Sequence, residues 1–199
     1  MGRVEAKEVP VPEPADYEIR VKVTYSSICG SDTHTLTAHL GEFEESTKAM
    51  LPMPFGHEVS GIIDKVGPKA EALGYHAGDK VVVNYAKYCY ACDNCRSGHE
   101  NLCTNLQFCM NGYGDGVYFA MYGKNPILKV NLHNDFYWNQ ENLHGVIMGT
   151  GLFPKAIKVA RRLDLESIIQ RVYPLSQYEK AFEDLYTKRF AKIVIKMDE

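Results

Sequence analysis

The 199-residue sequence predicts a mainly β fold with some helix, an α+β class, and three observations support it. The first 130 residues contain several short strand-like runs separated by glycine and proline, a pattern typical of a β-barrel or sandwich. Two segments after residue 150 carry apolar residues at helical spacing. The last residues, AKIVIKM, return to a strand pattern. We therefore expect a sheet-based core to which helices are added near the C-terminal end.

Three strands are expected in the N-terminal part of the chain. YEIRVKVTY (17–25) alternates apolar and polar residues, which is the period of a half-buried strand. EVSGIIDKVGP (58–68) ends at a Gly-Pro pair, and GYHAGDKVVVNY (74–85) has a Gly-Asp turn before three valines. Between Cys29 and His57 we expect a surface excursion with some helix, ended by two prolines.

Two helices are expected after residue 150. FPKAIKVARRL (153–163) and SQYEKAFEDLYTKR (176–189) both repeat apolar residues every three or four positions. Ser176 suits the N-cap of the second helix, and Glu179 would complete a capping box. The segment 191–197 then closes the chain as a strand.

Composition and charge narrow the class of protein. With 45% hydrophobic and 24% charged residues the chain is ordinary for a globular domain. The net charge of −3 gives no positive field for a polyanion, so we expect no nucleic-acid partner. We find no apolar run near the roughly 18 residues that a membrane span needs, and no signal peptide. We therefore expect a cytoplasmic protein with no membrane partner.

Four of the six cysteines form one cluster with the spacing C-x2-C-x2-C-x7-C. In a reducing compartment this clustering favours a metal site over disulfides. Four thiolates fill a tetrahedral zinc ion and leave no open position, which is typical of a structural site. A pair of disulfides and an iron–sulfur cluster remain as chemical alternatives. The predicted ligands of the structural zinc are Cys89, Cys92, Cys95 and Cys103.

Two short motifs suggest a second constellation, SSICGSDTH (26–34) and PFGHEVSG (54–61). Cys29 follows a predicted strand, and Gly30 permits a tight turn after it. His57 follows a glycine that allows close approach of the backbone. Taken alone, a single cysteine and a single histidine are more often packing residues than metal ligands. Their order along the chain, before the cysteine cluster, is what makes them informative.

The ordered set C-G-S-D-x-H, G-H-E and C-x2-C-x2-C-x7-C resembles that of the zinc-dependent medium-chain alcohol and polyol dehydrogenases, in particular the sorbitol and threonine dehydrogenase branch. GDKVVV (78–83) is similar to the strand before their structural-zinc lobe, and FYWNQENLHGV through KIVIKM (136–197) to their C-terminal return. The resemblance implies a GroES-like, partly open β-barrel. It assigns 1–133 to the catalytic domain, with the zinc lobe at 85–112, and 134–199 to the return packed on the same domain.

The resemblance also implies a second, catalytic zinc. Cys29 and His57 match two of its ligands, and Glu58 matches the acidic residue beside the metal, which ligates it directly or through water. Asp32 matches the carboxylate that orients His57 through its other ring nitrogen.

A proton relay is implied by two further residues of the first motif. Ser31 matches the hydroxyl that accepts the substrate's proton, and His34 the group that passes the proton toward solvent. Outside this motif, a turn hydroxyl and a surface histidine would be the simpler interpretations of the two residues.

The family's nicotinamide-binding Rossmann domain has no counterpart in this sequence. The glycines of NGYGDG (111–116) have the wrong spacing for a dinucleotide-binding turn, and GTGLFP (149–154) is interrupted by proline. We expect the domain to be missing near 130–134, together with the family's third protein ligand to the catalytic zinc. The structural zinc site should then be occupied, and the catalytic site weak or empty.

These observations predict the catalytic domain of a homo-oligomeric zinc-dependent NAD(P) dehydrogenase. The parent enzyme would oxidise a secondary alcohol of a polyol or sugar-type substrate to a ketone, and the isolated chain would be inactive. The alternative is a naturally short, zinc-stabilised barrel that acts as a non-enzymatic binding module. A zinc-finger nucleic-acid binder is disfavoured by the negative charge.

Overall fold

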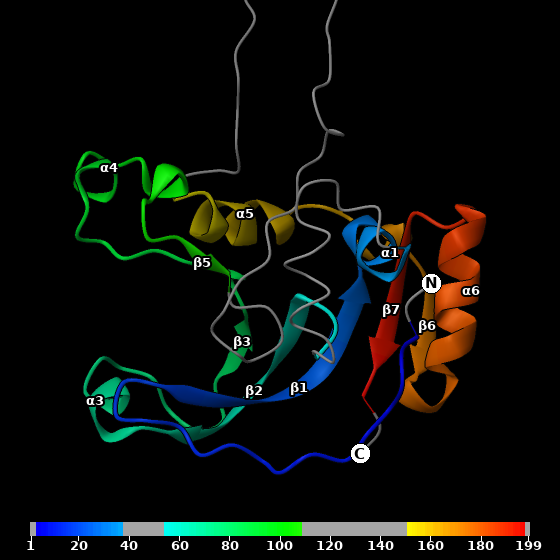
Figure 1. Cartoon of the computed structure of the whole chain (residues 1–199), viewed down its shortest axis with the longest axis horizontal. Coiled ribbons are helices and arrows are strands. Elements are labelled where there is room, and N and C mark those ends of the chain that lie inside the picture. The colour runs from blue at the N-terminus through cyan, green and yellow to red at the C-terminus, as the bar shows by residue number, and fades with distance from the viewer. Residues whose placement is uncertain (1–2, 38–53, 109–150, 198–199) are drawn as a thin grey trace, which may run out of the picture.

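The computed structural model describes residues 3–37, 54–108 and 151–197. Within these ranges five strands form one mixed sheet, and two short strands form a separate pair (Figure 1). The order across the large sheet is β3 (Lys80–Val82), β2 (Glu58–Val66), β1 (Ile19–Ile28), β7 (Lys192–Lys196) and β6 (Ile169–Pro174). The sheet therefore joins the N-terminal and C-terminal parts of the chain.

The antiparallel pairing of β1 and β2 builds the N-terminal half of the sheet. Its register places Ser27 opposite Glu58 and Ile19 opposite Val66. Gly61 lets the two strands approach, because a Cβ at this position would lie 2.2 Å from the backbone oxygen of Lys22. The register brings the end of β1 beside the start of β2, where both predicted motifs lie.

The C-terminal part forms a β-α-β unit on the other side of β1. Strand β6 pairs with β7 in parallel, and β7 pairs with β1 antiparallel. Between them run a 3-10 turn, η5 (Leu175–Gln177), and helix α6 (Tyr178–Thr187). Figure 1 shows α6 lying beside β6 and β7. The main hydrophobic core lies here and consists of Ile28, Leu36, Tyr173, Ala181, Phe182, Ile193 and Ile195.

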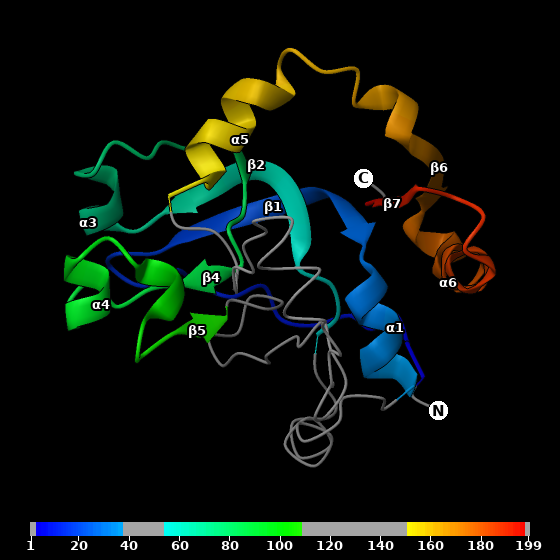
Figure 2. The ribbon, with the colours of Figure 1, turned by 90° about the horizontal axis from the view of Figure 1, so that it is seen from above.

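A cysteine-rich lobe and several short helices lie around this sheet. The lobe contains β4 (Ala86–Lys87), α4 (Asp93–Arg96), η2 (Glu100–Leu102) and β5 (Gln107–Phe108), and β4 pairs with β5. It lies at the opposite end of the molecule from α6 (Figure 2). The other helices are α1 (Gly30–Thr37), α3 (Pro68–Glu71), α5 (Phe153–Ala160) and η4 (Glu166–Ile168). In the ranges that the structure describes, every helix is too short or too polar to cross a bilayer.

Most of the expected elements are confirmed. Strands β1, β2, β3 and β7 and helices α5 and α6 lie where the patterns predict them. Two local expectations are wrong. Gly30 opens helix α1 rather than a tight turn, and its φ is not positive. Helix α6 follows a 3-10 turn, so Gln177 and not Ser176 occupies its N-cap position, without a side-chain capping bond.

Two further points separate sequence and structure. Strand β6 is not among the expected strands, because its sequence IQRVYP shows no clear alternation of apolar and polar residues. Most of its side chains are exposed in the structure. The proposed deletion near 130–134, the segment 111–116 and Cys109 lie outside the described residues.

Candidate metal centres

The cysteine lobe brings four sulfur atoms into one cluster. The sulfur atoms of Cys89, Cys92, Cys95 and Cys103 lie within 4.8 Å of one another, and those of Cys89 and Cys95 are 3.9 Å apart. A tetrahedral zinc ion with Zn–S bonds of 2.3 Å needs sulfur atoms about 3.8 Å apart. All four side chains are free thiols rather than disulfides. The spacing therefore fits a closed four-thiolate site.

Backbone groups of the lobe already point at these sulfur atoms. The N–H groups of Ala91 and Cys92 donate to Cys89 Sγ at 3.4 and 3.3 Å, and they lower the pKa of that thiol. Backbone donors, first that of Cys95, lower the pKa of Cys92 to about 6. Burial raises the pKa of Cys95 to about 12. A bound divalent cation would offset the cost of ionising the buried Cys95 thiol, because a coordinated thiol is deprotonated.

A second cluster forms where β1 ends and β2 begins. Cys29 Sγ, a ring nitrogen of His57 and a carboxylate oxygen of Glu58 lie within 4.8 Å of one another. Gly56, the residue before His57, has a φ of 100°, in a region that side-chain-bearing residues rarely adopt. A Cβ on Gly56 would also lie 3.1 Å from Ser26 Oγ. A glycine is therefore needed at the turn that sets His57 beside Cys29.

Asp32 and Ser31 contact the two ring nitrogens of His57 from helix α1. The His57 side chain is buried, and its Nδ1 lies 3.4 Å from Asp32 Oδ1. The Ser31 hydroxyl lies 3.4 Å from Nε2. Asp32, which is 2% exposed, also accepts the backbone N–H of Cys29 at 2.8 Å through Oδ2. One buried carboxylate therefore binds the backbone of one candidate ligand and lies beside the ring of another.

The protonation states of His57 and Cys29 depend on each other. Burial lowers the pKa of His57, but hydrogen bonds with Asp32 and then Cys29 outweigh it and raise the pKa to about 10. The hydrogen bond with His57 lowers the pKa of the Cys29 thiol. Without a metal the pair therefore tends toward imidazolium and thiolate. A metal ion would take the place of the proton between them.

Glu58 is held from its other side. Its Oε2 atom accepts a hydrogen bond from the Ser27 hydroxyl and forms an ion pair with Lys192 Nζ on β7. Burial raises the pKa of Glu58, but Lys192 and then Ser27 outweigh this effect, so that the pKa lies below its ordinary value. The carboxylate is therefore charged near neutral pH and already paired with Lys192.

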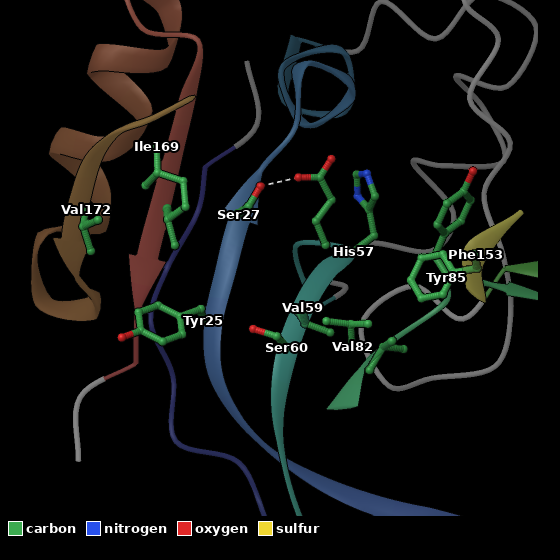
Figure 3. A pocket seen from close by; sticks show the side chains of 13 residues that line it. Tyr25, Ser27, His57, Val59, Ser60, Val82, Tyr85, Phe153, Ile169 and Val172 are labelled. Atoms are coloured by element: carbon green, nitrogen blue, oxygen red, sulfur yellow. Dashed lines mark hydrogen bonds between the residues drawn. The ribbon is translucent and has the colours of Figure 1, made fainter. Parts of the chain in front are cut away.

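A hollow of about 590 Å³ opens beside this cluster. His57 and Glu58 form part of its wall, and Tyr85 lies edge-on to the His57 ring with the ring centres 6.0 Å apart. Figure 3 shows Tyr85 and Phe153 on the His57 side and Ile169 and Val172 across the hollow on β6. An organic molecule in this hollow would have one end against the His57–Glu58 pair and the rest against mainly apolar side chains.

The structure therefore brings together Cys29, Ser31, Asp32, His57 and Glu58, all of which the sequence motifs single out. His34 lies in α1, three positions after Ser31, but its side chain is outside the described part of the chain. Sequence reasoning missed Ser27 and Lys192. Ser27 had a signal, since it lies near the end of β1 inside the motif SSICGSDTH, two positions before Cys29. Lys192 had none, because it is 134 residues from Glu58.

Comparison with known proteins identifies the family of the chain. The family model for the alcohol dehydrogenase GroES-like domain matches residues 15–127. The chain belongs to this family, the catalytic GroES-like domain of zinc-dependent medium-chain alcohol and polyol dehydrogenases. A crystal structure assigned as a zinc-binding dehydrogenase from Clostridium scindens superposes with a TM-score of 0.88 at 35% identity. The match covers 97% of this chain and 93% of that one. This overlap confirms the fold class.

Curated relatives match a shorter stretch. Alcohol dehydrogenase 1 of Caenorhabditis elegans is 39% identical over 107 residues, which are 53% of this chain and 29% of the relative. The (R,R)-butanediol dehydrogenase of Saccharomyces cerevisiae is 37% identical over 51% of this chain and 31% of its own length. The matched part of the chain thus spans less than a third of these relatives.

Proposed function

We propose that this chain is the metal-bearing, substrate-side part of an NAD(P)-dependent dehydrogenase that oxidises a secondary alcohol to a ketone. One observation carries the proposal: a thiolate, an imidazole and a carboxylate converge at the edge of an organic-sized hollow. Three protein donors that leave a fourth position open are typical of catalytic rather than structural zinc. The four-thiolate lobe would leave no coordination position open, so a zinc ion there would stabilise the fold.

Each residue of the cluster has a role that follows from its contacts. Cys29, His57 and Glu58 would hold the metal, and Asp32 would keep the His57 ring oriented through Nδ1. When bound, zinc acidifies an alcohol hydroxyl, and a nicotinamide accepts the hydride released from the carbinol carbon. Ser31, whose hydroxyl lies 3.4 Å from His57 Nε2, would accept the hydroxyl proton. His34 is the proposed next carrier of that proton toward solvent.

The substrate class is proposed more narrowly as a small polyol or sugar-type alcohol. The motifs C-G-S-D and G-H-E support this choice, as does the similarity to a relative named for butanediol. The cofactor domain is proposed to belong to the parent enzyme and to be missing near 130–134. The short share of the curated relatives that this chain matches supports that view.

The experiment is a metal count combined with an activity assay on the purified 199-residue chain. We expect one tightly bound zinc and a second, weaker metal that His57→Asn abolishes, while His99→Asn, an exposed histidine of the lobe, leaves both in place. Failure of the second metal to bind, or to respond to His57→Asn, would contradict the proposed site. We expect no turnover with NAD(P) and a panel of polyols and simple secondary alcohols. Steady NAD(P)H production would show instead that no further domain is required.

A further inference from the structure

The carboxylate of Glu58 lies close to the ammonium group of Lys192 and also to the proposed position of the metal ion. One of its oxygen atoms lies within 4.8 Å of Cys29 Sγ and His57, where a metal ion would sit. Its Oε2 atom is already paired with Lys192 Nζ. Lys192 is the first residue of the closing strand β7, far from both motifs in sequence.

The sheet holds Lys192 in this place. On one side of β7 the backbone of Lys192 is paired with Ile169 of β6, and on the other the next residue, Ile193, is paired with Ile28 of β1. The side chains of Lys192 and Glu58 are 30% and 35% exposed, so water only partly screens their attraction. The ion pair therefore joins two strands whose backbones the sheet holds in place.

We propose that Lys192 is a positioning residue that competes with the metal ion for Glu58 and thereby weakens metal binding at the Cys29–His57 site. This inference rests on the proposed metal site. A metal bound through Glu58 must either draw the carboxylate away from Lys192 or share it with the ammonium group. Both routes cost binding free energy, the first by breaking an ion pair and the second by placing two cations close together.

The competition has a consequence for substrate. While Lys192 and Ser27 hold Glu58, the protein supplies only a thiolate and an imidazole firmly, and more than one coordination position is left for an oxygen ligand from the hollow. Lys192 thus lowers the affinity for the metal ion and leaves coordination positions open to an oxygen ligand. The expected weakness of the second metal then has a cause inside this chain, in addition to any ligand that the parent enzyme supplies.

The test measures metal affinity without reference to turnover. The lobe is first filled with one equivalent of zinc, and Co²⁺ is then titrated while the thiolate charge-transfer and d–d absorption of the second site are followed. We expect Lys192→Gln to bind Co²⁺ about tenfold more tightly than the wild type. Lys192→Arg, which keeps the positive charge, should stay near the wild-type affinity.

Lys196→Gln is the matched control, since it removes one positive charge from an exposed position on the same strand. It should leave the affinity within about twofold, because an exposed charge is screened. The Lys192→Gln effect should also vanish in a Glu58→Gln background. Circular dichroism and thermal melting show whether each variant is folded.

The outcomes separate the two proposals. If the wild type gives no thiolate–cobalt signal from Cys29, the proposed metal site is wrong. If that signal is present but Lys192→Gln binds Co²⁺ equally or more weakly, the competition is wrong. The competition would also be overturned by an affinity gain that persists in the Glu58→Gln background or that Lys196→Gln reproduces. The gain would then come from the overall charge of the protein and not from the Lys192–Glu58 ion pair.

Discussion

The two candidate metal centres of this chain are built in opposite ways. The lobe takes all four ligands from the segment 89–103, where backbone N–H groups of the same loop point at the sulfur atoms. The Cys29–His57–Glu58 site takes its ligands from the ends of two strands and its supporting groups from α1 and β7. Among the described residues of the lobe only Ala86, Cys95 and Cys103 are buried, so the proposed zinc would supply much of its stability. The second site is held by the sheet, with or without a metal.

The largest expected effect is at the lobe. Cys95→Ser should lower the zinc content by about one ion per chain and lower the melting temperature by about 10 °C or more. The reason is that structural zinc supplies much of the folding free energy of such a segment. Zinc analysis and thermal melting measure the two quantities. Ala91→Ser, the same side chain at an exposed position of the lobe, is the control. Unchanged zinc content and stability in Cys95→Ser would rule out a zinc-bearing lobe.

A middle-sized effect is expected at the turn before His57. Gly56→Ala forces a side chain into a positive φ and against Ser26 Oγ, which should cost about 1–3 kcal/mol of stability. It should also abolish the weaker metal while sparing the lobe zinc. Gly30→Ala is a matched control, because a Cβ there meets no atom within 4 Å and the residue lies in a helix. Equal behaviour of the two variants would mean that the turn does not position His57.

The smallest effect on stability is expected for Asp32→Asn. The amide still accepts the N–H of Cys29 but no longer presents a charge to His57, so metal affinity should fall about 10–100-fold with little change in melting. Asp79→Asn is the control, since Asp79 accepts a backbone N–H from His76 at 2.9 Å in the same local pattern, away from the site. A Co²⁺ titration distinguishes the two. If both variants bind Co²⁺ like the wild type, Asp32 has only a local backbone role.

The expectations that the structure confirms rest on patterns within a single segment of the sequence. Strand β1 follows from the alternation of Ile19, Val21 and Val23 with polar residues. Helix α6 follows from the helical spacing of Tyr178, Ala181, Phe182 and Leu185. Those that failed depend on context. Strand β6 shows no alternation because its side chains are mostly exposed, and only pairing with β7 makes it a strand. Gly30 could have adopted a turn, and the chain continues as helix instead.

The sequence was enough to predict the candidate ligands of the lobe, because four cysteines within fifteen positions are close in any compact loop. The order of the motifs also pointed to Cys29, Asp32, His57 and Glu58 as candidate site residues. Which other groups reach that site depends on the tertiary structure. The register of β1 with β2 placed Ser27 on Glu58, and the return of β7 to β1 placed Lys192 there. Local spacing carries no information about such contacts, because they exist only once the sheet has joined both ends of the chain.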